Sequence, residues 1–140
     1  MPLVYSGILS HAPGITGRSH MVESDKIGIR DEFYACLDRQ REAIRLSGAE
    51  TLIVVAAEHF ANFFMDNMPA YCIGVGEKHT GPIEDSQWLG IGKKTIKGSP
   101  ELATRLMRVM LNNVDLAYSE EWQCDHGIMV PLNFLTPNYD

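Results

Sequence analysis

The sequence has little of what marks several large classes of protein. Its net charge is −6, and no run of basic residues is present. No apolar stretch approaches the roughly 20 residues that a membrane helix requires. The first residues, MPLVYSGILSHAPG, lack the positively charged region of a secretory signal peptide. We therefore expect neither nucleic acid nor a membrane among the partners of this protein.

Cysteine is also scarce. The three cysteines, Cys36, Cys72 and Cys124, are widely spaced and form neither a disulfide framework nor a CxxC pair. Free thiols favour a reducing compartment, so we expect a cytoplasmic protein. Cys36 and Cys72 lie in apolar segments and are interpreted as packing residues. Cys124 lies two residues before His126 and could instead be a ligand or a nucleophile, although no partner at metal-ligand spacing accompanies it.

What is present fits a single globular domain over residues 1–140, of which 45% are hydrophobic. An apolar helical stripe predicts a helix over residues 31–46, and Ser99-Pro100-Glu101 predicts the start of another. Apolar runs predict strands over residues 3–9, 51–57, 71–75 and 114–119. Residues 77–98 are interpreted as a long excursion, and residues 125–135 as the start of a further helix. Alternating strands and helices predict an α/β fold, with a largely parallel or mixed sheet flanked by helices.

Three histidines each follow a strand-like run: His11, His59 and His126. Ligands of parallel sheets bind beyond the carboxyl ends of the strands, so we expect these side chains to converge on one crevice. Two histidines and a carboxylate bind Fe(II) in non-haem oxygenases, and the same ligand set with zinc supports hydrolysis. This pattern alone leaves two explanations open, a metal site or three unrelated structural histidines.

Three longer segments carry a family resemblance. They are SHAPG at residues 10–14, EHFANFFMDNMPAYCIGVG at residues 58–76 and DHGIMVPLNFL at residues 125–135. Together, and in this order, they resemble the class III extradiol ring-cleavage dioxygenases. The resemblance covers most of this chain but only the N-terminal half of a family member.

The resemblance implies a non-haem Fe(II) enzyme that cleaves a catecholic ring with O2 and gives a ring-opened semialdehyde. It implies that His11 and His59 bind the iron and that His126 is an acid–base catalytic residue that does not bind it. Phe60, Phe63 and Phe64 could line the pocket or simply belong to the core. The identity of the catechol is not predicted and substrate-binding residues are unknown, since Arg18 and Arg30 are only candidates for contacting a substrate carboxylate.

The sequence departs from the family in one respect. The family's carboxylate ligand and a second catalytic histidine lie in the half that this sequence does not match. Glu58 would point away from His59 along a continued strand. Glu84, Asp85, Glu120 and Glu121 are conceivable substitutes, but each is better interpreted as a solvated loop acid.

Two further interpretations follow from this departure. The sheet is expected to be incomplete at its C-terminal end, which predicts a homo-oligomer or pairing with a missing C-terminal half or a second subunit. The alternatives to a dioxygenase are a catalytically incomplete interaction subunit and a zinc-dependent hydrolase. His20 and His79 lie in polar, Gly-rich segments and are interpreted as solvent-exposed loop histidines.

Overall fold

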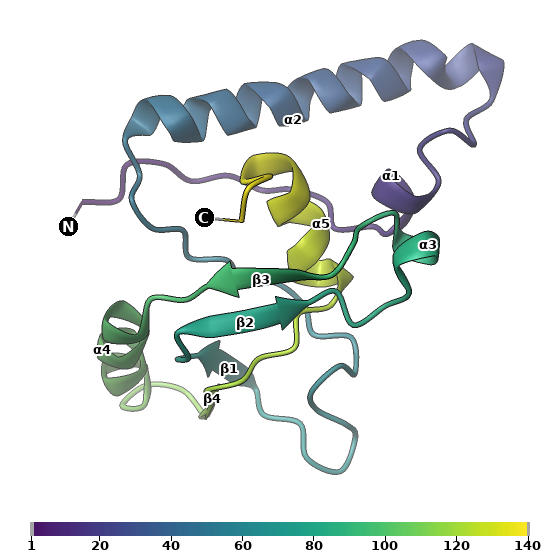
Figure 1. The fold of residues 1–140 in the computed structure, drawn as a ribbon. Helices are drawn as coiled ribbons and strands as arrows, with labels where there is room; N and C mark the ends of the chain where they lie inside the picture. Colours follow the sequence, from purple (N-terminus) through teal and green to yellow (C-terminus); the bar gives the residue numbers. More distant parts are fainter. Residues whose placement is uncertain (1, 140) are drawn as a thin grey trace.

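The computed structural model of this protein describes residues 2–139 and places helices around two short sheets (Figure 1). The strands are β1 (Tyr71–Gly74), β2 (Lys78–Gly81), β3 (Lys94–Lys97) and β4 (Leu116–Ser119). The helices are α1 (Gly14–Gly17), α2 (Ile27–Ser47), α3 (Ser86–Leu89), α4 (Pro100–Met110) and α5 (His126–Leu135), with a 3-10 turn, η1, at Ser24–Lys26.

The two sheets differ in direction. Strands β1 and β4 are parallel, with Tyr71 opposite Leu116, and helix α4 contacts both of them. Strands β2 and β3 are antiparallel, with Lys78 opposite Lys97. The predicted class, an α/β fold with a mixed sheet arrangement and flanking helices, is confirmed. The expected excursion at residues 77–98 is more ordered than predicted, because β2, α3 and β3 all lie within it.

Helix α2 is the longest element and matches the helix predicted for residues 31–46, with four more residues at its start. Leu37 and Ile44 are buried on one face, while ion pairs such as Arg45–Glu42 lie on the other. The helix ends at Gly48, whose φ of +68° is the left-handed conformation that glycine adopts at low cost. Helix α2 contacts α5 and lies along the top of the molecule in Figure 1.

Two of the predicted strands are not formed. Residues 3–9 and 51–57 carry no strand pairing, although both are strongly apolar. A strand is defined by ladder hydrogen bonds to a neighbour, and among residues 2–139 the parallel sheet holds only β1 and β4. Most apolar side chains of these segments therefore stay exposed, such as Ile8 at 95% and Val55 at 87%, although Leu52 packs against the core.

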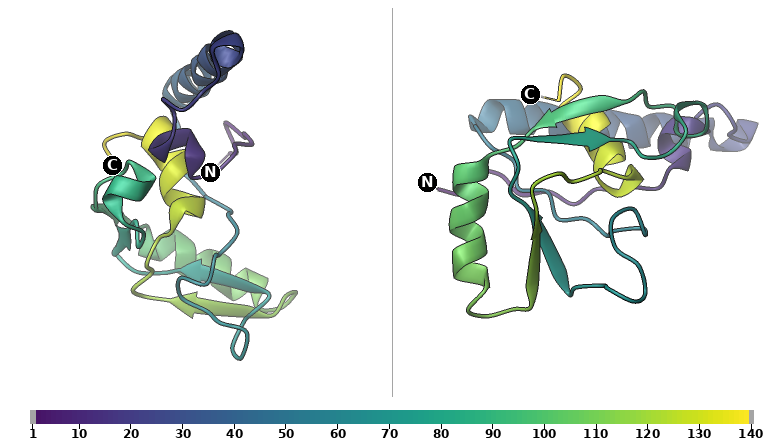
Figure 2. Two further views of the ribbon diagram at one scale, coloured as in Figure 1. Left: turned by 90° about the vertical axis from the view of Figure 1, so that its right-hand side faces the viewer. Right: turned by 60° about the horizontal axis from the view of Figure 1, so that its bottom comes forward.

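The core is centred on α5, which lies between α2 and the sheets in Figure 2. Buried side chains from α5 pack against Leu89, Ile91 and Cys124. Cys36 and Cys72, the cysteines interpreted as packing residues, are only partly buried, whereas Cys124 is 2% exposed and packs in the core. Because α5 is anchored in the core, its first residue, His126, has a fixed position.

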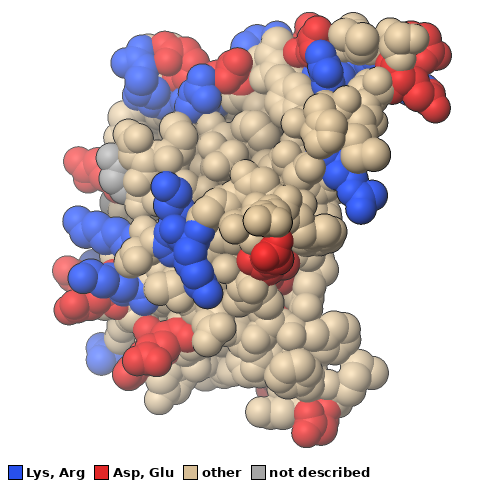
Figure 3. All heavy atoms as spheres, turned by 45° about the vertical axis from the view of Figure 1, so that its right-hand side comes forward, with Lys and Arg blue, Asp and Glu red and all other residues tan. Residues whose placement is uncertain are grey.

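Charged side chains are unevenly distributed over the surface. On the face shown in Figure 3, both signs of charge gather at the upper edge, along α2, and further groups of both signs lie on the left side and in the middle, with uncharged surface between them. None of the helices described for residues 2–139 is long and apolar enough to cross a membrane.

Candidate functional site

The three predicted histidines meet at one place. His11 lies just before α1, His59 follows the extended segment 51–57, and His126 begins α5. Each offers a ring nitrogen, and these nitrogens all lie within 4.8 Å of one another. The ring centroids of His59 and His126 are 4.1 Å apart, and that of His11 lies 5.1 Å and 5.9 Å from them. The convergence expected from the sequence is therefore present.

Asp125 orients His59. Its Oδ2 accepts hydrogen bonds from the backbone N–H and from the ring Nδ1 of His59, both at 2.9 Å. Its Oδ1 accepts from the backbone N–H of Gly127 at 2.9 Å and so caps the start of α5. A carboxylate that accepts from Nδ1 fixes the tautomer of a neutral imidazole, leaving the lone pair on Nε2. His59 is thus prepared to bind a metal through Nε2.

Glu84 contacts His126 through the same pair of hydrogen bonds. Its Oε1 accepts from the backbone N–H of His126 at 2.9 Å and from its ring Nδ1 at 2.6 Å. Both side chains are 16% exposed. Burial alone would raise the pKa of Glu84, but the hydrogen bonds from His126 outweigh it and the net pKa is lowered. Oε2 of Glu84 is buried and has no hydrogen-bond partner among residues 2–139.

Gly127 allows the two histidine segments to approach each other. A Cβ atom at this position would lie 2.6 Å from the carbonyl oxygen of Ala57 and 3.2 Å from the His59 ring. Real Cβ atoms essentially never approach another atom as closely as 2.6 Å, so a glycine is required for the present packing. The start of α5 can therefore lie directly against the chain that carries His59.

The Glu58 carboxylate stabilises the turn that follows His59. The Glu58 carboxylate accepts hydrogen bonds from the backbone N–H groups of Phe60, Ala61 and Asn62. Burial opposes ionisation, but these bonds outweigh it and lower the pKa of Glu58. Asn62 in turn exchanges two hydrogen bonds with the backbone of Gln123, which ties the turn to the chain entering α5.

No carboxylate joins the histidine cluster within residues 2–139. The prediction that Glu84 is a solvated loop acid is wrong, because it is mostly buried against His126. Asp85 caps α3, accepting from two backbone N–H groups at 2.9 Å. Glu120 and Glu121 are exposed, as expected.

No sequence signal pointed to the contact between Glu84 and His126. The position of Asp125 at the start of an apolar helix, in contrast, is typical of an N-cap.

The two other histidines do not belong to the cluster. His20 is exposed, as predicted. The prediction of an exposed loop for His79 is wrong, because it lies in β2, is half-buried, and accepts a hydrogen bond from the backbone N–H of Trp122 at 3.2 Å. Burial lowers the pKa of His79, which favours its neutral form.

The aromatic residues beside His59 do not form a core. Phe60 and Phe64 are 52% and 57% exposed. Phe63 is partly buried and packs on Trp122, with ring centroids 5.8 Å apart. The surface next to the histidines is therefore partly aromatic and open.

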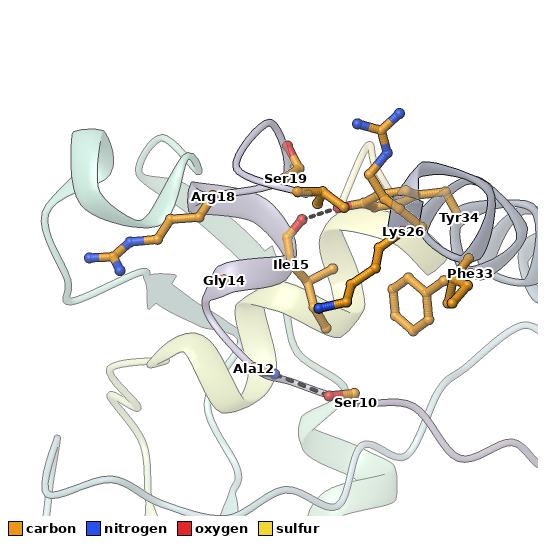
Figure 4. A pocket seen from close by; sticks show the side chains of 12 residues that line it. Ser10, Ala12, Gly14, Ile15, Arg18, Ser19, Lys26, Phe33 and Tyr34 are labelled. Atoms are coloured by element: carbon orange, nitrogen blue, oxygen red, sulfur yellow. Dashed lines mark hydrogen bonds between the residues drawn. The ribbon is translucent and has the colours of Figure 1, made fainter. Parts of the chain in front are cut away.

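An open pocket of about 490 Å³ lies between α1 and α2 (Figure 4). Arg18 and Arg30, the predicted candidates for a substrate carboxylate, both line it together with Ser10 and Ala12, the neighbours of His11. Arg30 is already paired with Asp31. None of the three clustered histidines lines this pocket, so it is separate from the candidate metal centre.

Comparison with known proteins identifies the family. The family described as the catalytic LigB subunit of aromatic ring-opening dioxygenase matches residues 6–140, nearly the whole chain. The chain belongs to this family. The match includes all three clustered histidines and both carboxylates that orient them.

The chain is also similar to curated proteins. The chain is 31% identical over 137 residues to 2,3-dihydroxyphenylpropionate/2,3-dihydroxicinnamic acid 1,2-dioxygenases of Escherichia coli, among them those of strains K12 / DH10B and O157:H7 EC4115. The alignment covers 97% of this chain and 40% of each of these relatives. The chain thus spans less than half the length of the curated relatives that it matches.

Proposed function

We propose that this chain, as a single α/β domain over residues 1–140, takes part in the Fe(II)-dependent extradiol cleavage of a catecholic ring by O2, giving a ring-opened semialdehyde. The observation that carries the proposal is the convergence of His11, His59 and His126 in a member of the LigB family. The three free thiols lead us to propose a cytoplasmic location.

His11 and His59 are the proposed iron ligands. Asp125 fixes the His59 ring so that Nε2 carries the lone pair, which is the form a metal requires. The candidate ligand nitrogens of the cluster all lie within 4.8 Å of one another, close to the separation of at most about 4.2 Å for two nitrogens bound about 2.1 Å from one ion. These residues therefore fit a divalent metal. Bound iron would supply adjacent open positions for the catechol oxygens and O2.

The remaining ligand is proposed to come from elsewhere. Two histidines and one carboxylate form the usual ligand set of this chemistry, and no carboxylate of residues 2–139 lies in the cluster. We propose that a second copy of the chain, a further length of chain or a partner subunit provides it. Association of this kind would also cover the exposed apolar segments at residues 3–9 and 51–57.

His126 is the proposed acid–base residue. With Nδ1–H donated to Glu84, Nε2 is free to accept the proton of a catechol hydroxyl and to return it later in the reaction. Its ring lies 4.1 Å from that of the proposed ligand His59, so a catechol bound at the metal would reach it.

The test is oxygen uptake by the Fe(II)-loaded chain with a panel of catechols, followed by the absorbance of the ring-fission product. We expect His11→Ala and His59→Ala to lose iron binding, measured anaerobically by titration. His20→Ala is the matched control, because His20 is exposed and outside the cluster. Iron content unchanged in His59→Ala would contradict the ligand assignment.

Two alternatives have distinct outcomes in the same experiment. The first alternative is an interaction subunit, which fits the lack of a carboxylate in the cluster within residues 2–139. Such a subunit consumes no oxygen with any catechol, even when a partner is added. A zinc-dependent hydrolase binds Zn²⁺ at the same histidines but shows no oxygen uptake with either metal.

A further inference from the structure

We propose that Glu84 is a positioning residue that holds His126 in the tautomer with Nδ1 protonated and Nε2 free to accept a proton. This inference rests on the proposed function of His126 as the acid–base residue. It gives a role in the reaction to a side chain that lies 42 residues away from His126 in the sequence.

The geometry of the contact supports an orienting role. A single oxygen, Oε1, accepts both the backbone N–H and the ring Nδ1–H of His126, so backbone and ring are fixed relative to each other. Asp125 holds His59 with the same pair of hydrogen bonds. The two histidines whose rings are closest in the cluster are thus each oriented by one carboxylate oxygen that accepts from both backbone and ring.

Glu84 is itself held in a fixed position. The chain that leads to it is bonded to the chain that leads to His126, because the carbonyl oxygen of Thr80 accepts from Cys124 at 2.7 Å and the N–H of Ile83 donates to the Cys124 carbonyl at 3.1 Å. Cys124 belongs to the buried core. The carboxylate therefore reaches His126 from a rigid support, as an orienting group must.

A role for Glu84 as the missing metal ligand does not fit this geometry. Its Oε1 is already bonded to Nδ1 of His126, and among residues 2–139 Glu84 does not belong to the cluster of candidate metal ligands. A carboxylate at Nδ1 instead favours the imidazolium that forms when Nε2 takes a proton from the substrate hydroxyl, whose electron pair stays on oxygen. The second oxygen, Oε2, has no partner among residues 2–139, so the hydrogen bonds described for this carboxylate both come from His126.

The first test is the tautomer of His126, read from ¹⁵N–¹H correlation spectra of the metal-free chain. We expect the unaltered chain to show a protonated Nδ1 with a strongly downfield proton. Glu84→Gln, whose amide oxygen still accepts one bond, should keep this tautomer and move the proton upfield. Glu84→Ala should shift the ring toward the Nε2-protonated form. Glu77→Gln, an exposed carboxylate just before β2, is the matched control and should change neither signal.

The second test separates positioning from binding. In a preparation that turns over catechol, Glu84→Ala should lower kcat by about 10–100-fold with little change in KM. The kcat of Glu84→Gln should lie between those of Glu84→Ala and the unaltered protein. The proposal is overturned if folded Glu84→Gln leaves the Nδ1 proton unmoved, or if Glu84→Ala keeps both the tautomer and kcat. If the tautomer shifts as expected but no preparation consumes oxygen, the proposed function has failed and the positioning by Glu84 stands.

Discussion

At the scale of single residues, the orientation of each histidine depends on a carboxylate from a distant segment. Asp125 is 66 residues from His59, and Glu84 is 42 residues from His126. Neither carboxylate is a member of the histidine cluster, yet each determines which ring nitrogen is available. The chemistry of the site therefore includes groups that do not touch a metal.

Replacement of Asp125 should separate its two contributions. Asp125→Asn keeps an oxygen able to cap α5, but it cannot accept both hydrogen bonds from His59. Asp125→Ala loses the cap as well. We expect metal affinity to fall by about 10–100-fold in both variants, and the free energy of unfolding to be lower in the alanine variant by a further ~1 kcal/mol. Calorimetric titration and urea unfolding measure the two quantities, and equal stabilities would contradict the capping role.

The cysteines should differ strongly in reactivity. Burial raises the pKa of Cys124 to about 12 and that of Cys72 to about 11, so at pH 8 both remain thiols. Cys36 lies partly exposed on α2. With iodoacetamide at pH 8, mass spectrometry should find Cys36 modified first, and Cys124 only after denaturant is added. Rapid modification of Cys124 in the native chain would show that the core around α5 opens readily.

At the scale of elements, α5 connects the core with the site. Its apolar residues Met129, Val130 and Leu132 are buried, while its first residue belongs to the histidine cluster. Its N-terminal end lies against the segment 51–57 through the close approach at Gly127. A change at this contact should therefore affect both stability and metal binding.

Gly127→Ala tests this contact. The added methyl group would overlap the Ala57 carbonyl and approach the His59 ring, so we expect a loss of about 1–3 kcal/mol in the free energy of unfolding and weaker metal binding. Gly28→Ala is the matched control, because a Cβ at that position in α2 meets nothing within 4 Å. It should be neutral or stabilise the protein by up to about 1 kcal/mol. Similar losses in both variants, measured by urea unfolding, would contradict the packing argument.

The sequence predicted some elements well because their signals are local. An apolar stripe predicted α2, and the start at Ser99-Pro100-Glu101 predicted α4, although the Ser99 hydroxyl makes no capping bond. Strands β1 and β4 were predicted close to their bounds. Residues 3–9 and 51–57 have equally strong apolar runs, but whether they form strands depends on neighbours that composition does not specify.

The site shows the same division between local and distant signals. The histidines were found because each follows an apolar run, a signal contained in a few residues. Their carboxylate partners were not found, since the contact between Glu84 and His126 arises only from the pairing of the chain around β2 with the chain before α5. Packing at Gly127 was likewise not predicted.

At the scale of the whole molecule, stability should depend on pH through Glu84. Its pKa is lower in the folded protein than the ordinary value of 4.5, so the folded state binds a proton less readily than the unfolded chain. The resulting stabilisation is complete above that ordinary value and is lost as the pH falls through the lowered pKa. The difference in unfolding free energy between the unaltered protein and Glu84→Gln should therefore shrink in acid.

Urea unfolding followed by circular dichroism at a series of pH values from 7 to about 3.5 measures this difference. Glu77→Gln serves again as the control, because its carboxylate is exposed. A difference between Glu84→Gln and the unaltered protein that stays constant with pH would show that Glu84 stabilises the fold by packing alone.

The origin of the three histidines in separate stretches of chain has a consequence for folding. An ion held by His11 and His59, with His126 beside it, would crosslink segments that are far apart in sequence and would close long loops. Because the unfolded chain does not bring these rings together, the ion would bind the folded form alone. At a free ion concentration 100 times the dissociation constant, this linkage adds about 2.7 kcal/mol to the free energy of unfolding. Thermal denaturation with and without the ion would thus report on assembly of the site, even where no substrate is known.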